Sequence, residues 1–196
     1  ELWPETIRGL LVHSAKWTDQ MEQQIPGNYE IDRQRRLRCF GYGVPNLDRA
    51  RYTVENCVSL VHQGAIQPYK LEGSVAKTNH FMLHSLPWPI AALVDMHVQD
   101  VTVKITLSYF IEPNPSDCGW GTKFRYASHG LRFALKGPTE TEDHFKQRLS
   151  SQEWEEENFQ PGNRPSMQDP IDWTIGRLKN RGSIHCDWWT ASAEEV

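Results

Sequence analysis

The sequence predicts an α+β fold that is mainly β, with an antiparallel β-sandwich of the jelly-roll kind preceded by helices. Residues 101–109 (VTVKITLSY) alternate apolar and polar types, and β-branched and aromatic residues fill most positions. This is the pattern of a half-buried strand, with its Thr, Lys and Ser side expected to face solvent. Short strand-like segments surround it, whereas the apolar positions before residue 57 follow helical spacing.

Length and composition set broad limits on function. The chain has 196 residues, of which 38% are hydrophobic and 23% charged, so it can bury a core. No apolar run reaches the roughly 18 residues that a membrane span requires, so no membrane partner is expected. The net charge of −4 argues against a broad nucleic-acid surface.

The four cysteines are widely spaced and form no CxxC pair. They are Cys39, Cys57, Cys118 and Cys186. Such spacing favours free thiols in a reducing compartment over a zinc site or a disulfide framework. The sequence therefore predicts a cytoplasmic protein.

The N-terminal segment predicts two helices joined by polar sequence. Residues 4–16 combine Pro4 in the first turn with an apolar face of Ile7, Leu10 and Leu11. His13 lies within this helix, where packing or surface exposure is the expected role rather than catalysis. A tight glycine turn at residues 41–43 precedes a second helix, from an N-cap at 46 to about residue 54.

Two features of this segment suggest phosphate binding, but a structural interpretation fits each of them better. Four arginines fall within residues 33–38, with acidic neighbours that favour a solvated face. Gly41 and Gly43 begin a dinucleotide-loop pattern, yet Asn46 stands where its last glycine belongs.

The remainder reads mostly as strands. They are expected at 58–62, 66–71, 80–86, 101–111, 124–135 and 182–189. His80 and His84 would be metal ligands on a helix, but the following Pro-Trp-Pro favours a strand and a turn. His185 and Asp187 share a strand face. They could form a zinc pair, but a polar strand face is the preferred interpretation. Trp88 and Trp120 supply rigid aromatic surface typical of interfaces.

Residues 139–158 interrupt the strand pattern with seven acidic and two basic residues. Thr139 and Glu142 fit a capping box, and Phe145 with Leu149 forms an i, i+4 apolar pair, so a helix is predicted. The clustered glutamates could hold a cation, although a solvated helix face is the better interpretation.

No catalytic constellation appears in the chain. There is no G-x-S-x-G elbow, Walker loop or HExxH motif, and His129-Gly130 lacks the flanks of a catalytic histidine. The sequence therefore assigns no catalytic residue, no metal ligand and no cofactor site.

Two motifs resemble the end of the catalytic domain in bacterial subtilisin-like serine peptidases. PETIRGLLVHSA matches a helix of that family at Pro4, Ile7, Arg8, Leu11, Ser14 and Ala15. GYGVPNLDRA matches its closing turn and helix at Gly41, Gly43, Asn46 and Ala50, with Pro45 in the usual place of an apolar residue. LHSLPWP, VKITLSYFIEPNP, YASHGLRFALKGPTET and RGSIHCDWW are similar to a C-terminal extension of the same group, so the resemblance covers nearly the whole chain.

The resemblance implies that residues 1–56 are the tail of a subtilisin-like α/β domain and residues 57–196 a β-sandwich extension carrying the acidic helical insertion near 139–158. The chain begins without Met and inside a helical pattern, which suggests a piece of a longer protein. The family's triad would then precede Glu1, and the extension would brace the catalytic domain or contact a protein or peptide substrate. The alternative is a free-standing β-rich module that binds a protein or ligand. A homo-oligomer is compatible with either.

Overall fold

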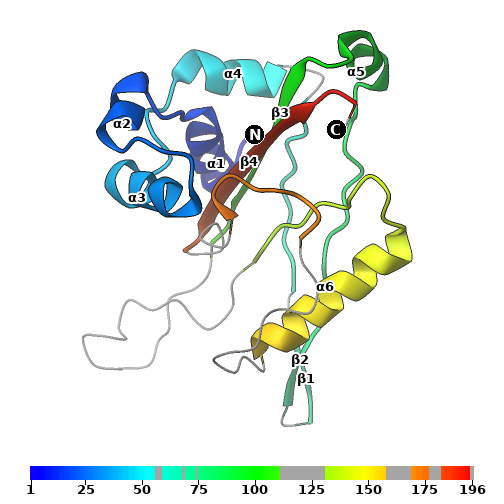
Figure 1. Cartoon of the computed structure of the whole chain (residues 1–196). Coiled ribbons are helices and arrows are strands. Elements are labelled where there is room, and N and C mark those ends of the chain that lie inside the picture. Colours follow the sequence, from blue (N-terminus) through cyan, green and yellow to red (C-terminus); the bar gives the residue numbers. More distant parts are fainter. Residues whose placement is uncertain are drawn as a thin grey trace, which may run out of the picture.

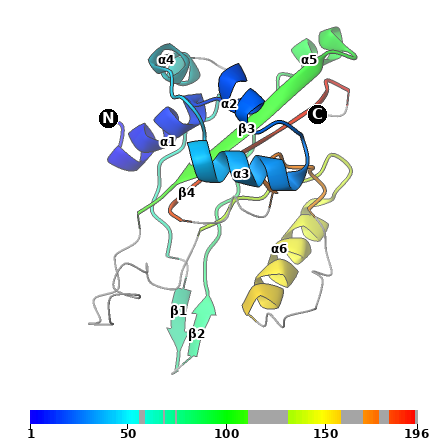
Figure 2. The same ribbon diagram turned by 60° about the vertical axis from the view of Figure 1, so that its left-hand side comes forward.

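A computed structural model describes residues 1–55, 59–67, 69–73, 75–110, 131–157, 169–176 and 182–194. Its elements are α1 (Pro4–Ser14), α2 (Asp19–Gln24), α3 (Glu30–Phe40), α4 (Leu47–Glu55), β1 (Tyr69–Glu72), β2 (Val75–Thr78), α5 (Ile90–Met96), β3 (Asp100–Ser108), α6 (Glu142–Glu157) and β4 (Ile184–Ser192). Helices α1 to α4 gather beside a long ribbon of β3 and β4, while α6 and the β1–β2 hairpin lie away from them (Figures 1 and 2).

The ribbon of β3 and β4 is the longest ladder in the described part of the chain. The strands are antiparallel, in a register that runs from Asp100 opposite Ser192 to Ser108 opposite Ile184. The strand expected at residues 101–111 is thereby confirmed, and β1 pairs with β2 in a second, shorter antiparallel sheet. Both sheets have two strands, and helices outweigh strands among the described residues.

The α+β class is confirmed, but a jelly-roll β-sandwich and a mainly β composition are not supported. Expected strands at 59–62, 80–86 and 131–135 have no ladder partners in the described structure, and residues 111–130 lie outside it. Apolar, strand-like composition leads to a strand only where another strand offers hydrogen bonds in register.

Helix boundaries follow local chemistry. Pro4 occupies the first turn of α1, where its missing N–H costs nothing. Asn46 caps α4 as expected, because its Oδ1 accepts from the Arg49 N–H at 2.8 Å. The helix expected in residues 139–158 is α6, but its cap is Thr141 rather than Thr139, with Oγ1 accepting from the His144 N–H at 3.3 Å.

The two faces of the ribbon differ in what covers them. Odd-numbered residues of β3 and β4 share one face, where Trp189 packs edge-on against Trp173, which in turn meets Phe133. Ile175 is the most deeply buried apolar residue there, with 1% of its surface exposed. Even-numbered residues share the opposite face, beside α1.

Asp187 fixes the loop at residues 173–176 to the odd-numbered face. It is fully buried, and its Oδ1 accepts from the N–H groups of Ile175 at 2.8 Å and Trp188 at 2.9 Å. Its Oδ2 accepts from the Gly176 N–H at 2.9 Å. A buried carboxylate that accepts several backbone N–H groups is stabilised as the anion and holds the segments that donate to it.

We therefore expect Asp187→Asn to destabilise the fold by about 2–4 kcal/mol, because an amide NH₂ would face one of these N–H donors without an acceptor. Urea unfolding followed by tryptophan fluorescence measures the change. Asp172→Asn, on the same loop and exposed, is the matched control. Equal midpoints for the two variants would contradict this role of Asp187.

Candidate functional site

The strongest concentration of polar contacts in the described structure lies between α1 and the even-numbered face of the ribbon. We call Arg8, His13, Lys104, Thr106 and Ser108 the polar seam. The sequence predicted that the Thr, Lys and Ser side of β3 would face solvent, and that prediction is wrong from residue 104 onward. Lys104, Thr106 and Ser108 are all partly buried against α1.

Arg8 clamps the open end of the ribbon to α1. Its Nε donates to Ser108 Oγ at 2.9 Å, and its Nη2 donates to the carbonyls of Tyr109 at 2.9 Å and Ser183 at 2.7 Å. Its Nη1 reaches Ser183 Oγ at 3.2 Å. The planar guanidinium thus bridges both strands at once, which a point charge such as lysine cannot reproduce.

His13 continues the polar seam toward the middle of the ribbon. Its Nδ1 lies 3.0 Å from Thr106 Oγ1, which in turn donates to the Cys186 thiol at 3.2 Å. Lys104 donates to the Ala15 carbonyl at 2.7 Å and lies over the Trp188 ring, 5.2 Å from its centroid. The C-terminal turn of α1 is therefore held by β3, whose Thr106 and Lys104 also contact Cys186 and Trp188 of β4.

Burial makes these groups unreactive at neutral pH. The pKa of His13 is lowered from 6.5 to about 4, first by burial and then by the charge of Lys104. Burial raises the pKa of the Cys186 thiol, against a smaller opposing effect of Lys104. The neutral imidazole of His13 and the protonated, fully buried thiol of Cys186 are joined through Thr106. Nucleophilic chemistry requires the thiolate, so this arrangement is structural.

A ladder of aromatic and cationic groups extends the contact to α3. The Arg36 guanidinium lies over Trp17 at 5.4 Å, and Trp17 meets Trp188 edge-on with centroids 5.3 Å apart. At the other end of this series, Lys104 lies over the Trp188 ring. Each such pair contributes about 0.5–1 kcal/mol at partly exposed sites.

The two motifs that resemble subtilisin-like peptidases interlock. Ser14 Oγ accepts from the Asn46 N–H at 3.0 Å, and the Ser14 carbonyl accepts from Arg49 Nε at 2.8 Å. Lys16 and Val44 form an antiparallel bridge with N–O distances of 2.9 and 3.2 Å. Gly43 is required at this crossing, because its φ is +95° and a Cβ there would overlap the Lys16 carbonyl.

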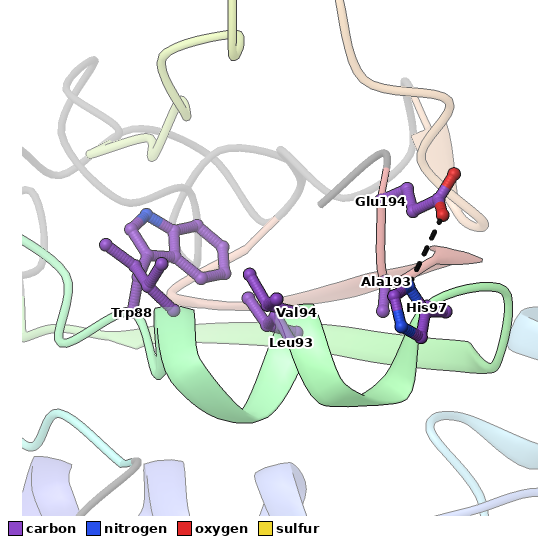
Figure 3. Close-up of a pocket in the computed structure, with 7 residues that line it drawn as sticks. Trp88, Leu93, Val94, His97, Ala193 and Glu194 are labelled. Carbon is purple, nitrogen blue, oxygen red and sulfur yellow. Dashed lines mark ion pairs between the residues drawn. The ribbon is translucent and has the colours of Figure 1, made fainter.

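An apolar groove of about 500 Å³ lies between α5 and the end of β4. Its lining comprises Trp88, Ile90, Leu93, Val94, His97, Ala193 and Glu194. Figure 3 shows the Trp88 indole at one end and the His97–Glu194 ion pair, 3.8 Å long, at the other. Trp88 is 37% exposed, whereas Trp120 lies outside the described residues.

The residues weighed as metal ligands, for which other roles were preferred, occupy different parts of the described structure. His185 and Asp187 do share a face, but His185 approaches the Gly182 carbonyl at 3.0 Å and Asp187 accepts backbone N–H groups. His80 and His84 lie on an irregular segment, and His129 lies outside the described residues. Among the described residues, no group of three or more His, Cys, Asp or Glu could hold a metal ion.

The remaining candidates are structural. Arg36 of the arginine cluster is buried and donates to the carbonyls of Ile25, at 2.9 Å, and Gly27. Cys39 and Cys186 are free thiols, as expected, and the other two cysteines lie outside the described residues. No helix in the described parts of the chain is long and apolar enough to cross a membrane.

The polar seam was missed because its residues are unremarkable singly. Thr106 and Ser108 belong to ordinary polar positions of an alternating strand, and Arg8 follows helical spacing. The available signal was His13, which lies on the side of α1 away from Ile7 and Leu11, together with Arg8 at the edge of their apolar face. That pattern marks a second, polar contact surface.

Comparison with known proteins gave no match to any family model, curated protein or solved structure.

Arg8→Lys should lower the free energy of unfolding by about 1–2 kcal/mol, since one ammonium cannot serve the acceptors on both strands. Thermal and urea unfolding measure the loss. Arg38→Lys, on the exposed surface of α3, should change stability by less than about 0.5 kcal/mol. If both variants behave alike, the clamp contributes nothing.

His13 should make the fold acid-sensitive. Its folded pKa lies below 6.5, so the unfolded chain binds the proton more tightly and stability falls as pH drops from 6.5 toward 4. The loss should reach about 2 kcal/mol near pH 4.5. His13→Asn keeps a group that can bond Thr106 but removes the proton site, so its pH profile should be flatter than that of the wild type.

Exposed His144→Asn is the matched control for this pH profile. Carboxylates also titrate in this range, so the informative quantity is the difference between variant and wild type at each pH. A profile of His13→Asn that superimposes on the wild type would exclude His13 as the source of the acid sensitivity.

Proposed function

We propose that this chain is the non-catalytic C-terminal region of a subtilisin-like serine endopeptidase, and that the part after residue 56 braces the catalytic domain. In this proposal residues 1–56 form the tail of that domain, and proteolysis belongs to residues that precede Glu1. The proposal places the protein in the cytoplasm, on the basis of the cysteine pattern.

The observation that carries the proposal is the interlock of the two motifs. Ser14, Ala15 and Ala50, which carry part of the resemblance, are all buried where α1 meets α4. Asn46 binds Ser14, and Gly43 permits the crossing at Lys16. Residues chosen for their likeness to one family thus prove to be those that hold the two segments together, which supports a shared local architecture.

The exposed apolar side of α1 supports the proposal that a further domain packs against this helix. Ile7 and Leu11 are 49% and 43% exposed, and Leu2 and Trp3 beside them are 40% and 46% exposed. An amphipathic helix in a folded protein normally buries its apolar stripe. Here the ribbon takes the polar side of α1, so the apolar side is available for the catalytic domain of the longer protein.

The polar seam supports bracing rather than catalysis. It joins α1 to β3 and β4 through buried, neutral or hydrogen-bonded groups, and no nucleophile–base pair with an accessible reacting atom occurs there. Stabilising α1 in this way would stabilise whatever packs on its other side.

The decisive test compares Ile7→Gln plus Leu11→Gln in two contexts. In the 196-residue chain the double change should cost about 1.5–3 kcal/mol, because each side chain is about half exposed. In the longer protein, where the catalytic domain would bury both, the cost should roughly double. Urea unfolding measures both.

Ile31→Gln, at a 54% exposed position on α3, controls for helix propensity and should cost little in either context. The reading frame before Glu1 supplies the prerequisite: a Gly-Thr-Ser motif shortly upstream is expected, and its absence would reject the proposal. Equal effects of the double change in both contexts would also reject it.

The groove between α5 and β4 favours the second candidate, a free-standing module that binds a protein or ligand. Its apolar lining and the exposed Trp88 are of the kind found at binding surfaces. Under that hypothesis Trp88→Ala would weaken binding of a partner without altering stability. Under the bracing hypothesis the same change would mildly lower the stability of the longer protein.

A further inference from the structure

The β1–β2 hairpin brings together two histidines that are 22 positions apart in the sequence. Residues 59–67 and 79–89 run alongside each other from the hairpin, and Asn79 Nδ2 donates to the Gln67 carbonyl at 3.1 Å just beyond the paired strands. Farther along, the rings of His62 and His84 meet with centroids 4.3 Å apart and planes tilted by 51°. Both side chains are exposed.

This separation fits two imidazoles bound to one metal ion. A metal bonded to an imidazole nitrogen at about 2.0–2.1 Å lies about 3.2 Å from the ring centroid. Two such rings at an N–metal–N angle of about 90° have centroids about 4.5 Å apart, and about 5.2 Å apart at a tetrahedral angle. The observed 4.3 Å is within a few tenths of an ångström of the 90° arrangement.

Met82 lies near His62. A Cβ built on Gly64 would be 3.0 Å from Nε2 of His62 and 3.2 Å from the methyl group of Met82, so these two side chains share one side of Gly64. Two imidazoles suit Cu²⁺ and Zn²⁺ rather than Mg²⁺ or Ca²⁺, and a thioether ligand from Met82 would favour copper.

We propose that His62 and His84 form a two-imidazole site for a copper ion, with Met82 as a neighbouring thioether. The site is independent of the peptidase proposal. Its occupation would tie the segments 59–67 and 79–89 together. Because a ligand that binds only the folded state stabilises it, copper at 100 times its dissociation constant would add about 2.7 kcal/mol to the free energy of unfolding.

The test titrates Cu²⁺ into the full chain at pH 7.5, by calorimetry and by electron paramagnetic resonance, in a Cys39→Ser background that removes the exposed competing thiol. We expect one tight equivalent whose spectrum shows coupling to imidazole nitrogens. His62→Ala and His84→Ala should each weaken it at least tenfold. His80→Ala and His144→Ala, both at exposed positions, should leave it unchanged.

Further arms distinguish the ligand set. Zn²⁺ should bind more weakly than Cu²⁺, and Mg²⁺ should not compete. Met82→Leu should weaken the binding of Cu⁺, added under reducing conditions, more than the binding of Cu²⁺. Affinity should fall as the pH is lowered, because the imidazoles must be neutral to bind. No tight equivalent, or equal binding by the wild type and both histidine variants, would show that the two rings merely pack together and would overturn the proposal.

Discussion

The guanidinium of Arg8 joins both strands at the end of the β3–β4 ribbon to helix α1, and each of these elements depends on that contact. A two-stranded ribbon is marginally stable alone, and an 11-residue helix is marginal in water. His13, Lys104 and Thr106 make hydrogen bonds between them, one joining His13 and Thr106 and the other from Lys104 to the Ala15 carbonyl. The pairing therefore rests on directional bonds made at fixed positions along both elements.

A polar contact of this kind constrains geometry more than it adds stability. Each hydrogen bond contributes only about 1 kcal/mol net, because both groups were solvated before folding, but a buried donor left without its acceptor costs more. A helix shifted along the ribbon would leave the partly buried Lys104 without its acceptor and would break the hydrogen bonds of the exposed Arg8. The rings of Trp17 and Trp188 extend the same constraint to α3 through Arg36, so several elements share one register.

Periodicity in the sequence predicted the elements better than their environment. Residues 4–16 and 101–111 yielded α1 and β3 because each repeats over enough residues to define one face, whereas α6 was predicted from a capping signal and one i, i+4 apolar pair. Alternation shows which side chains share a face but not what covers it, so the burial of the Thr, Lys and Ser side of β3 was not foreseen. Contacts such as Asp187 with Ile175 join separate segments, and no local pattern encodes them. The expected sandwich failed for the same reason, since composition does not provide a pairing strand.

The two surfaces of α1 also bear on where one structural unit ends. If residues 1–56 belong to a catalytic domain, the Ile7 and Leu11 side would pack on that domain while Arg8 and His13 hold the ribbon. The helix would then belong to both units, and a boundary drawn near residue 57 would separate the chain but not the packing. Removing everything after that point would leave the polar groups of α1 without their acceptors and would weaken one of the last helices of the preceding domain. A brace of this kind acts through shared secondary structure, so it requires no contact with a reacting group.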